Sequence, residues 1–277
     1  MKDLIIGTST NYDWSKLKYW VNSINQSGFE GDKVLILMNC DAETAQKVVD
    51  SGFSVIAFGK DEKGNLTYES KMPVHTERFF HMYHFLRQRE YRYVITTDVK
   101  DVVFQKNPIE FLEKECVNKN LVFASESMKY KDEPWGNQNL QETYGDYIYN
   151  IFKENEIYIV GVLAGHGYAM RDLILNIFIA TTGRPIPICD QSTFNFLISQ
   201  NPYIHLSKYC KSEDGWAAQL GTTGDPSKSS QFDPLLLEPK PVYNDDVVTT
   251  STGEEFYIVH QYDRVPGLRE KIERKFG

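Results

Sequence analysis

Three short apolar runs alternate with two amphipathic segments near the start of the chain, and this alternation constrains the fold more than any other feature. The runs DLIIGTS (3–9), KVLILMN (33–39) and FSVIAFG (53–59) each have the length and composition of a strand. The segments at 14–28 and 41–52 carry apolar residues at helical spacing and end at a glycine. Strands alternating with helices in this way predict an α/β fold, a parallel sheet with helices on both faces.

The same alternation continues into the part of the chain with the most distinctive polar residues. The elements predicted next are a loop at 60–71, helices at 73–90 and 107–115, and strands at 91–98 and 102–105. The strand at 91–98 ends in Asp98. Ligands of open α/β sheets bind beyond the carboxyl ends of the strands, so this position marks Asp98 as a candidate site residue.

The second half is less regular, and nothing in it resembles a linker or a repeat. Strands are predicted at 120–127, at the start of 157–170, at 203–207 and at 256–264, and helices at 144–152, 171–183, 190–200 and 267–276. The aromatic-rich stretch EPWGNQN (133–139) and the polar stretch from Cys210 to Val242 are predicted as loops. We therefore predict a single domain spanning 1–277.

Composition narrows the possible partners and the compartment. The net charge of -8 disfavours non-specific binding to nucleic acid, so a phosphate ligand would need a local basic patch or a metal ion. No apolar run is long enough to span a bilayer, and the first run is too short for a signal peptide. The four cysteines have no zinc-binding spacing. We expect a protein of a reducing, cytoplasmic compartment with no transmembrane segment.

Two acids flank the exit of the fourth predicted strand, in YVITTDVKDVVFQKNP (93–108). Carboxylates in this position suit Mg²⁺ or Mn²⁺, with a diphosphate completing the coordination shell. His260 ends the apolar run of another predicted strand and is a plausible third ligand, which would favour Mn²⁺. The alternative is that Asp98 caps a turn and Asp101 faces solvent.

Other motifs are absent or open to two interpretations. The first strand is followed by GTSTNYD, which lacks the G-x-G-x-x-G of a dinucleotide site, and the chain has neither a Walker loop nor a G-x-S-x-G elbow. Asp190 begins DQSTFNFLI and is expected either to cap that helix or to accept a proton from a substrate. Trp216, in the long loop, would either stack on a sugar or anchor the loop to the body.

Taken together, these segments resemble those of nucleotide-sugar glycosyltransferases of the GT-A fold. The resemblance covers residues 3 to about 265 and depends on LIIGTSTNY, TTDVKDVVFQ, GVLAGHGYAM, CDQSTFNFLI and VHQYDR. The element TDVKDVVFQKNP looks especially like one found in glycosyltransferase-like proteins of plants and large algal viruses. The resemblance implies a Rossmann-like, mixed and mainly parallel sheet flanked by helices. It also implies a nucleotide-binding part at about 1–108 and an acceptor-side part at about 109–277.

The resemblance further implies a reaction and a set of site residues. The reaction is metal-dependent transfer of a sugar, with Mn²⁺ or Mg²⁺, from a nucleotide-diphosphate donor such as a UDP-sugar to a glycan or another hydroxyl acceptor. The implied metal ligands are Asp98, Asp101 and His260, and Asp98 also meets the donor. The implied donor-binding residues are Thr8, Thr10, Asn11, Tyr12, Arg78, Gly161 and Gly165, and Asp190 and Gln191 are the implied catalytic residues on the acceptor side. The family pattern is D-x-D, whereas this chain has D-x-x-D, so which acid is the direct ligand stays open.

Two other classes of protein remain as alternatives. A phosphotransferase would use Asp98 as a nucleophile at a strand end, but the spacing to Asp101 fits that class poorly. A non-catalytic protein with the same fold would bind a nucleotide sugar or carbohydrate without turnover. A nucleotidyltransferase is disfavoured because the glycine-rich N-terminal phosphate loop is missing.

Overall fold

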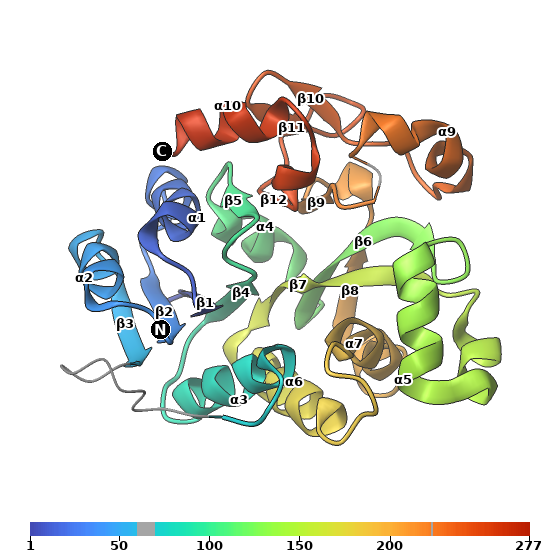
Figure 1. Ribbon diagram of the computed structural model, residues 1–277, viewed down its shortest axis with the longest axis horizontal. Helices are drawn as coiled ribbons and strands as arrows, with labels where there is room; N and C mark the ends of the chain where they lie inside the picture. Colours follow the sequence, from blue (N-terminus) through green and yellow to red (C-terminus); the bar gives the residue numbers. More distant parts are fainter. Residues whose placement is uncertain (60–69, 223) are drawn as a thin grey trace.

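The computed structural model describes residues 1–59, 70–222 and 224–277 of the chain. A seven-stranded mixed sheet in the order β3-β2-β1-β4-β7-β6-β8 lies at its centre, with helices on both faces (Figure 1). The prediction of an α/β fold with helices flanking a sheet is therefore confirmed. The predicted loop at 60–71 falls almost entirely outside the described residues. Among these residues, no helix is long and apolar enough to cross a membrane.

The first half folds in the predicted alternation, because each apolar run is covered by the amphipathic helix that follows it. Its elements are β1 (Leu4–Thr10), α1 (Trp14–Gln26), β2 (Asp32–Met38), α2 (Ala42–Asp50), β3 (Ser54–Phe58), α3 (Val74–Leu86) and β4 (Tyr93–Thr97). β1 is parallel to both β2 and β4, and β2 is parallel to β3. The carboxyl ends of these strands therefore meet at one edge of the sheet.

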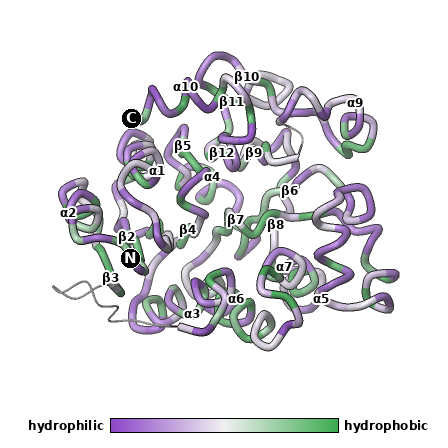
Figure 2. Tube along the Cα trace, in the orientation of Figure 1, coloured by the Kyte–Doolittle hydropathy of each residue, from purple (hydrophilic) through white to green (hydrophobic). Residues whose placement is uncertain are grey.

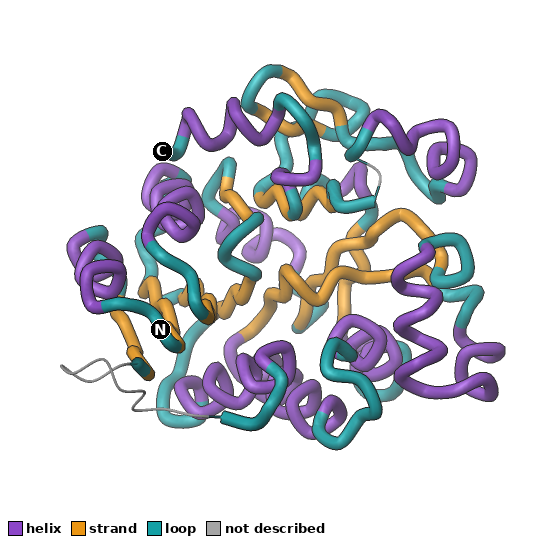
Figure 3. Tube along the Cα trace, in the orientation of Figure 1, coloured by secondary structure: helices purple, strands orange, loops and turns teal. Residues whose placement is uncertain are grey.

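The second half extends the sheet and adds two small ones. Its elements are β5 (Val102–Phe104), α4 (Pro108–Glu115), β6 (Leu121–Lys129), α5 (Pro134–Phe152), β7 (Glu156–His166), α6 (Gly167–Thr181), α7 (Asp190–Ile198), α8 (Tyr203–Leu206), β8 (Ser207–Cys210), β9 (Ala217–Gln219), α9 (Ser229–Phe232), β10 (Val242–Asn244), β11 (Val247–Thr249), β12 (Ile258–His260) and α10 (Leu268–Lys275). β7 is antiparallel to its neighbours β4 and β6, whereas β6 and β8 are parallel. A second sheet, β5-β12-β9, lies beside the central one (Figure 3).

The core forms two layers, one on each face of the central sheet. One layer packs residues of α1, α2 and α4 against the strands, and the other packs α3, α6 and α7. Figure 2 shows apolar residues concentrated along the central strands, whereas the outer helix α10 is largely hydrophilic. Strands covered on both faces are expected to read as continuous apolar runs, which is how β1, β2 and β4 read in the sequence.

Close packing at the end of β4 holds the candidate site residues in place. The indole nitrogen of Trp20 donates to the Thr97 hydroxyl over 2.8 Å. A Cβ on Gly7 would lie 2.4 Å from Val99 Cγ1, so only glycine lets β1 approach this turn so closely. Asp98 lies between Thr97 and Val99, and its backbone is therefore held by the core on both sides.

The structure corrects two secondary-structure predictions. The stretch 133–139 is not a loop, because α5 begins at Pro134 and the Glu133 side chain caps it by accepting from the backbone N–H of Gly136. The stretch 203–207 is not a strand: α8 occupies most of it, and β8 begins only at Ser207, which lies opposite Leu121 of β6. The predicted loop from Cys210 to Val242 contains the short elements β9 and α9.

Trp216 is a core residue. Its side chain is fully buried, and its ring stacks on Phe111 with a centroid distance of 4.9 Å. The interpretation that Trp216 stacks on a sugar is therefore wrong, and the alternative that it anchors the loop to the body is correct.

Trp216→Ala should lower the free energy of unfolding by ~3–5 kcal/mol, because truncation removes a fully buried indole and leaves a cavity. Denaturant unfolding followed by circular dichroism measures the loss. Tyr147→Ala is the control, since Tyr147 is 78% exposed and its truncation should change stability by less than ~0.5 kcal/mol. An equally small effect for Trp216→Ala would contradict its place in the core.

Candidate metal and ligand site

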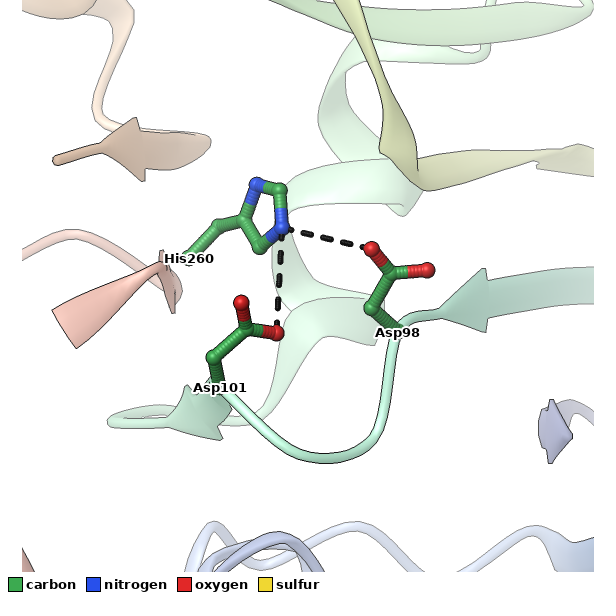
Figure 4. A group of neighbouring side chains, drawn as sticks. All are labelled: Asp98, Asp101 and His260. Atoms are coloured by element: carbon green, nitrogen blue, oxygen red, sulfur yellow. Dashed lines mark ion pairs between the residues drawn. The ribbon is translucent and has the colours of Figure 1, made fainter. Parts of the chain in front are cut away.

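Asp98, Asp101 and His260 form a compact group at the carboxyl end of β4 (Figure 4). His260 Nε2 lies 3.5 Å from Asp98 Oδ2 and 4.0 Å from Asp101 Oδ1. One ligand atom from each of the three residues falls within 4.8 Å of the others. Two carboxylate oxygens and an imidazole nitrogen at this separation form a donor set that suits Mn²⁺.

Strand pairing brings His260 to the two acids. β12 pairs antiparallel with β5, and His260 lies opposite Val102, the residue after Asp101. The backbone N–H of Gln261 donates to the Asp101 carbonyl over 2.7 Å and closes the pairing. The distant histidine therefore reaches the acids because of backbone hydrogen bonds and not because of any local sequence motif.

The state of His260 fits a metal ligand. The residue is 4% exposed, and neither ring nitrogen makes a hydrogen bond within the described part of the chain. Buried polar atoms are rarely left unpaired, and a cation between His260 and the acids would satisfy the imidazole. The imidazole, whose Nε2 has only long ion-pair contacts with Asp98 and Asp101, is the structural observation that makes the residues fit a divalent metal ion.

The pKa values of Asp98, Asp101 and His260 are shifted in different directions by burial and by neighbouring charges. Burial opposes the charged form of Asp98, but Arg78 and His260 outweigh it and hold the pKa of Asp98 well below its usual range. Burial raises the pKa of Asp101, with a further contribution from the charge of Asp98. Burial alone would lower the pKa of His260, but the facing carboxylates of Asp98 and Asp101 outweigh it and raise that pKa. A cation that binds here must therefore displace protons, so its affinity falls at low pH.

Arg78 connects this group to the opposite wall of the site. From α3, one guanidinium nitrogen donates to Asp98 and the other to Asp190 Oδ2 over 2.7 Å. Asp190 is the first residue of α7 and is 3% exposed; the helix N-cap is Cys189. The predicted capping role of Asp190 is thus not what the structure shows, because its carboxylate pairs with Arg78 instead.

The predicted glycines lie at different places along β7, Gly161 at its middle and Gly165 next to its carboxyl end. Gly161 faces the metal group, where an added Cβ would lie 2.6 Å from His260 Cε1 and 2.9 Å from Asp98 Oδ2. Gly165 pairs with Val94, toward the amino end of β4, and an added Cβ there would meet the Asn120 carbonyl. Because β7 runs antiparallel to β4, the two glycines point to different ends of the sheet. The predicted ligand-binding role of Gly165 is therefore corrected: this residue does not line the site.

The remaining predicted residues line one cavity of about 750 Å³. It is bordered by Thr8, Thr10, Asn11, Tyr12, Arg78, Asp98, Asp101, Gly161, Asp190, Gln191 and His260. Asn11 turns the chain after β1 with a positive φ of 58°. Burial and the charges of Asp101 and Asp98 raise the pKa of Tyr12.

Several residues that line this cavity were not identified from the sequence, among them Glu126, Glu133 and Trp135. Both ends of the Gln191 amide are engaged, because its oxygen accepts from Val160 N over 2.9 Å and its nitrogen donates to Glu126 Oε1 over 2.8 Å. Gln191 therefore holds Glu126 in the cavity wall. Glu126 follows the apolar run of β6, so the signal that identified Asp98, an acid after a buried strand, could also have found it.

The chain matches no protein-family model, and no curated protein matches it either. What the fold and the cavity define is therefore a class: an α/β protein with a candidate divalent-cation site at the carboxyl end of its central strands.

Gly161→Ala should weaken Mn²⁺ binding by about tenfold, because the added methyl group pushes His260 and Asp98 apart. Titration calorimetry with MnCl₂ alone measures the affinity. Gly59→Ala is the matched control, since among the described residues its Cβ would meet only the Cys40 carbonyl, at 3.5 Å. Equal Mn²⁺ affinity in the two variants would contradict the assigned ligand group.

Glu126 should make the metal-free protein less stable as the pH rises. Burial, with the neighbouring charge of Glu133, raises the pKa of Glu126 from 4.5 to about 8. The folded state therefore binds more protons than the unfolded state between these values, and stability falls with increasing pH across that window. Glu126→Gln should flatten the fall, measured by denaturant unfolding in chelator at several pH values. The exposed Glu142→Gln should leave the slope as in the unmodified protein, and an unchanged slope in Glu126→Gln would refute the assignment.

Proposed function

We propose that the protein is a metal-dependent glycosyltransferase of the GT-A type, which transfers a sugar from a UDP-sugar to a hydroxyl group of a glycan. The single observation that supports this most is the group Asp98, Asp101 and His260 at the wall of a large polar cavity. That cavity also contains the turn after β1 and the first residue of α7. Ligand sites at the carboxyl ends of the strands are typical of α/β folds, and this one has room for a nucleotide sugar.

Asp98, Asp101 and His260 would hold a Mn²⁺ ion. When bound, the ion neutralises the diphosphate of the donor and stabilises the charge that develops on the leaving nucleotide. Lys100 and Arg264 also line the cavity and add positive charge on this side. A chain with a net charge of -8 can bind an anionic donor in this way, because the local field is inverted.

The turn after β1 would hold the nucleoside. Tyr12 is partly buried against the core and borders the cavity, where its ring can stack on a uracil base. Thr8, Thr10 and Asn11 precede it along the same wall. Contacts remote from the reacting bond hold the donor in a productive position, and their binding energy lowers the barrier to transfer.

Asp190 and Arg78 would act on the sugar side. Arg78 keeps Asp98 and Asp190 at a fixed separation, and it is therefore a positioning residue. Asp190 would accept the proton of the attacking hydroxyl group in an inverting displacement. Asp190 and Gln191 are the first two residues of α7, so this helix brings both side chains to the cavity. Gln191 also orients Glu126 of β6.

UDP should bind more tightly in the presence of Mn²⁺ than in chelator, because the ion and the diphosphate complete each other's coordination. In Asp98→Asn, the gain in UDP affinity caused by Mn²⁺ should be at least about tenfold smaller, which corresponds to ~1.4 kcal/mol of binding free energy. Titration calorimetry of UDP with and without MnCl₂ measures both quantities, with Asp172→Asn on the exposed side of α6 as the control.

Equal UDP affinity with and without Mn²⁺ would refute the metal role. Mn²⁺-dependent release of UDP from a UDP-sugar, assayed with several sugars, then separates an enzyme from a protein that only binds. Mn²⁺-enhanced binding without release or transfer would favour the non-catalytic alternative.

A further inference from the structure

Three exposed apolar side chains lie together on the rim of the cavity. Trp135 is 50% exposed, Ile188 40% and Val74 37%, and all three border the same space as the metal group. They come from the start of α5, the segment before α7 and the start of α3. Apolar groups scattered singly over a surface need no explanation, but a group of three at the mouth of a polar cavity is typical of a ligand-binding surface.

The rim is held in place by hydrogen bonds behind it. Asn139 is four residues after Trp135, so the two side chains lie on the same face of α5. The Asn139 amide donates to the Ile188 carbonyl over 2.5 Å and accepts from the Ser192 hydroxyl over 2.5 Å. This contact joins α5 to the segment that carries Ile188. The backbone segments that carry the indole and the isoleucine are therefore joined before any ligand binds, which reduces the entropy lost on binding.

Hydrogen-bond acceptors lie beside the indole. Glu133, two residues before Trp135, is 7% exposed, borders the cavity and accepts from the Thr222 hydroxyl over 3.3 Å. Glu126 borders the same space and is held by Gln191. Carboxylates accept hydrogen bonds from hydroxyl groups and repel phosphates and acidic chains.

A sugar ring matches this combination. One face of a pyranose presents C–H groups that pack against a flat aromatic ring, while its edge presents hydroxyl groups that donate to carboxylates. A phosphate group has no C–H face of this kind to pack against the indole.

We infer that Trp135 and Ile188, backed by Glu133, form the subsite for a sugar ring of the glycan acceptor. This inference deepens the proposed function and rests on it only in calling the bound sugar an acceptor. The sequence suggested Trp216 for stacking on a sugar; we assign that role to Trp135, which borders the cavity and is not buried in the core.

The first test measures sugar binding without donor, metal or turnover. Trp20 and Trp216 are fully buried, whereas Trp135 is half exposed, so acrylamide quenching of tryptophan fluorescence reports largely on Trp135 with a contribution from Trp14. Lactose, cellobiose and maltotriose, each titrated at millimolar concentrations, are the probes. At least one should protect the unmodified protein from quenching in a saturable manner, and Trp135→Phe should lose the protected signal. Protection by none of the three, or protection that persists in Trp135→Phe, would overturn the inference.

The second test measures transfer, with the sugar from the first test as acceptor. Trp135→Ala should raise the acceptor KM by about tenfold, as expected for truncation of a central aromatic contact, while Trp135→Phe should retain most of the affinity. Tyr147→Ala is the matched control, because Tyr147 is an exposed aromatic residue of the same helix outside the cavity. An unchanged KM in Trp135→Ala, with circular dichroism and melting temperature as in the unmodified protein, would overturn the acceptor subsite. Failure of UDP to bind with Mn²⁺ would instead refute the proposed function and leave the fluorescence result standing.

Discussion

The double ion pair of Arg78 is the interaction on which the site depends. Its guanidinium is largely buried and bridges Asp98, at the end of β4, and Asp190, at the start of α7. The planar fork of an arginine can hold two carboxylates at once, whereas a lysine offers a single point of charge. Removing one partner of such a buried pair typically costs ~3–5 kcal/mol, because the remaining charge is left unpaired. The pair therefore links α3 to two other elements and also sets where the acids of the cavity lie.

Strand pairing and one glycine complete the arrangement that Arg78 begins. The β5–β12 ladder brings His260 next to Asp101, and the missing side chain of Gly161 leaves room for the imidazole against Asp98. Neither the β5–β12 pairing nor the space left by Gly161 would by itself bring the three side chains together. Because His260 makes no hydrogen bond with the described residues, the structure holds an unsatisfied nitrogen where two carboxylates converge. Buried groups left unsatisfied in this way are commonly found at functional sites.

The cavity is lined by groups of different chemistry. Lys100 and Arg264 line it with the metal group and the turn after β1, which suits an anionic nucleotide. The indole of Trp135, with the carboxyl groups of Glu126 and Glu133, suits a hydroxyl-rich ring. Glu126 also lies close enough to His260 for their charges to interact, so the two ligands of the proposed transfer would bind next to each other.

Local patterns in the sequence determined the βαβ alternation of the first half, the end of β4 at Asp98 and the apolar character of the strands. These features depend on neighbours in the chain, since periodicity and strand length are local properties. The tertiary structure alone decided which distant residues meet. It separated Gly161 from Gly165 through the antiparallel direction of β7, buried Trp216 against Phe111, and placed Trp135 at the rim through the contact between Asn139 and Ile188. The sequence predicted the second part of α5, at 144–152, but its first turns were missed, although the Glu133 cap that starts them is a local contact. The short helix at 203–206 was missed for a different reason: the β6–β8 ladder begins only at Ser207, and that depends on a contact with the distant Leu121.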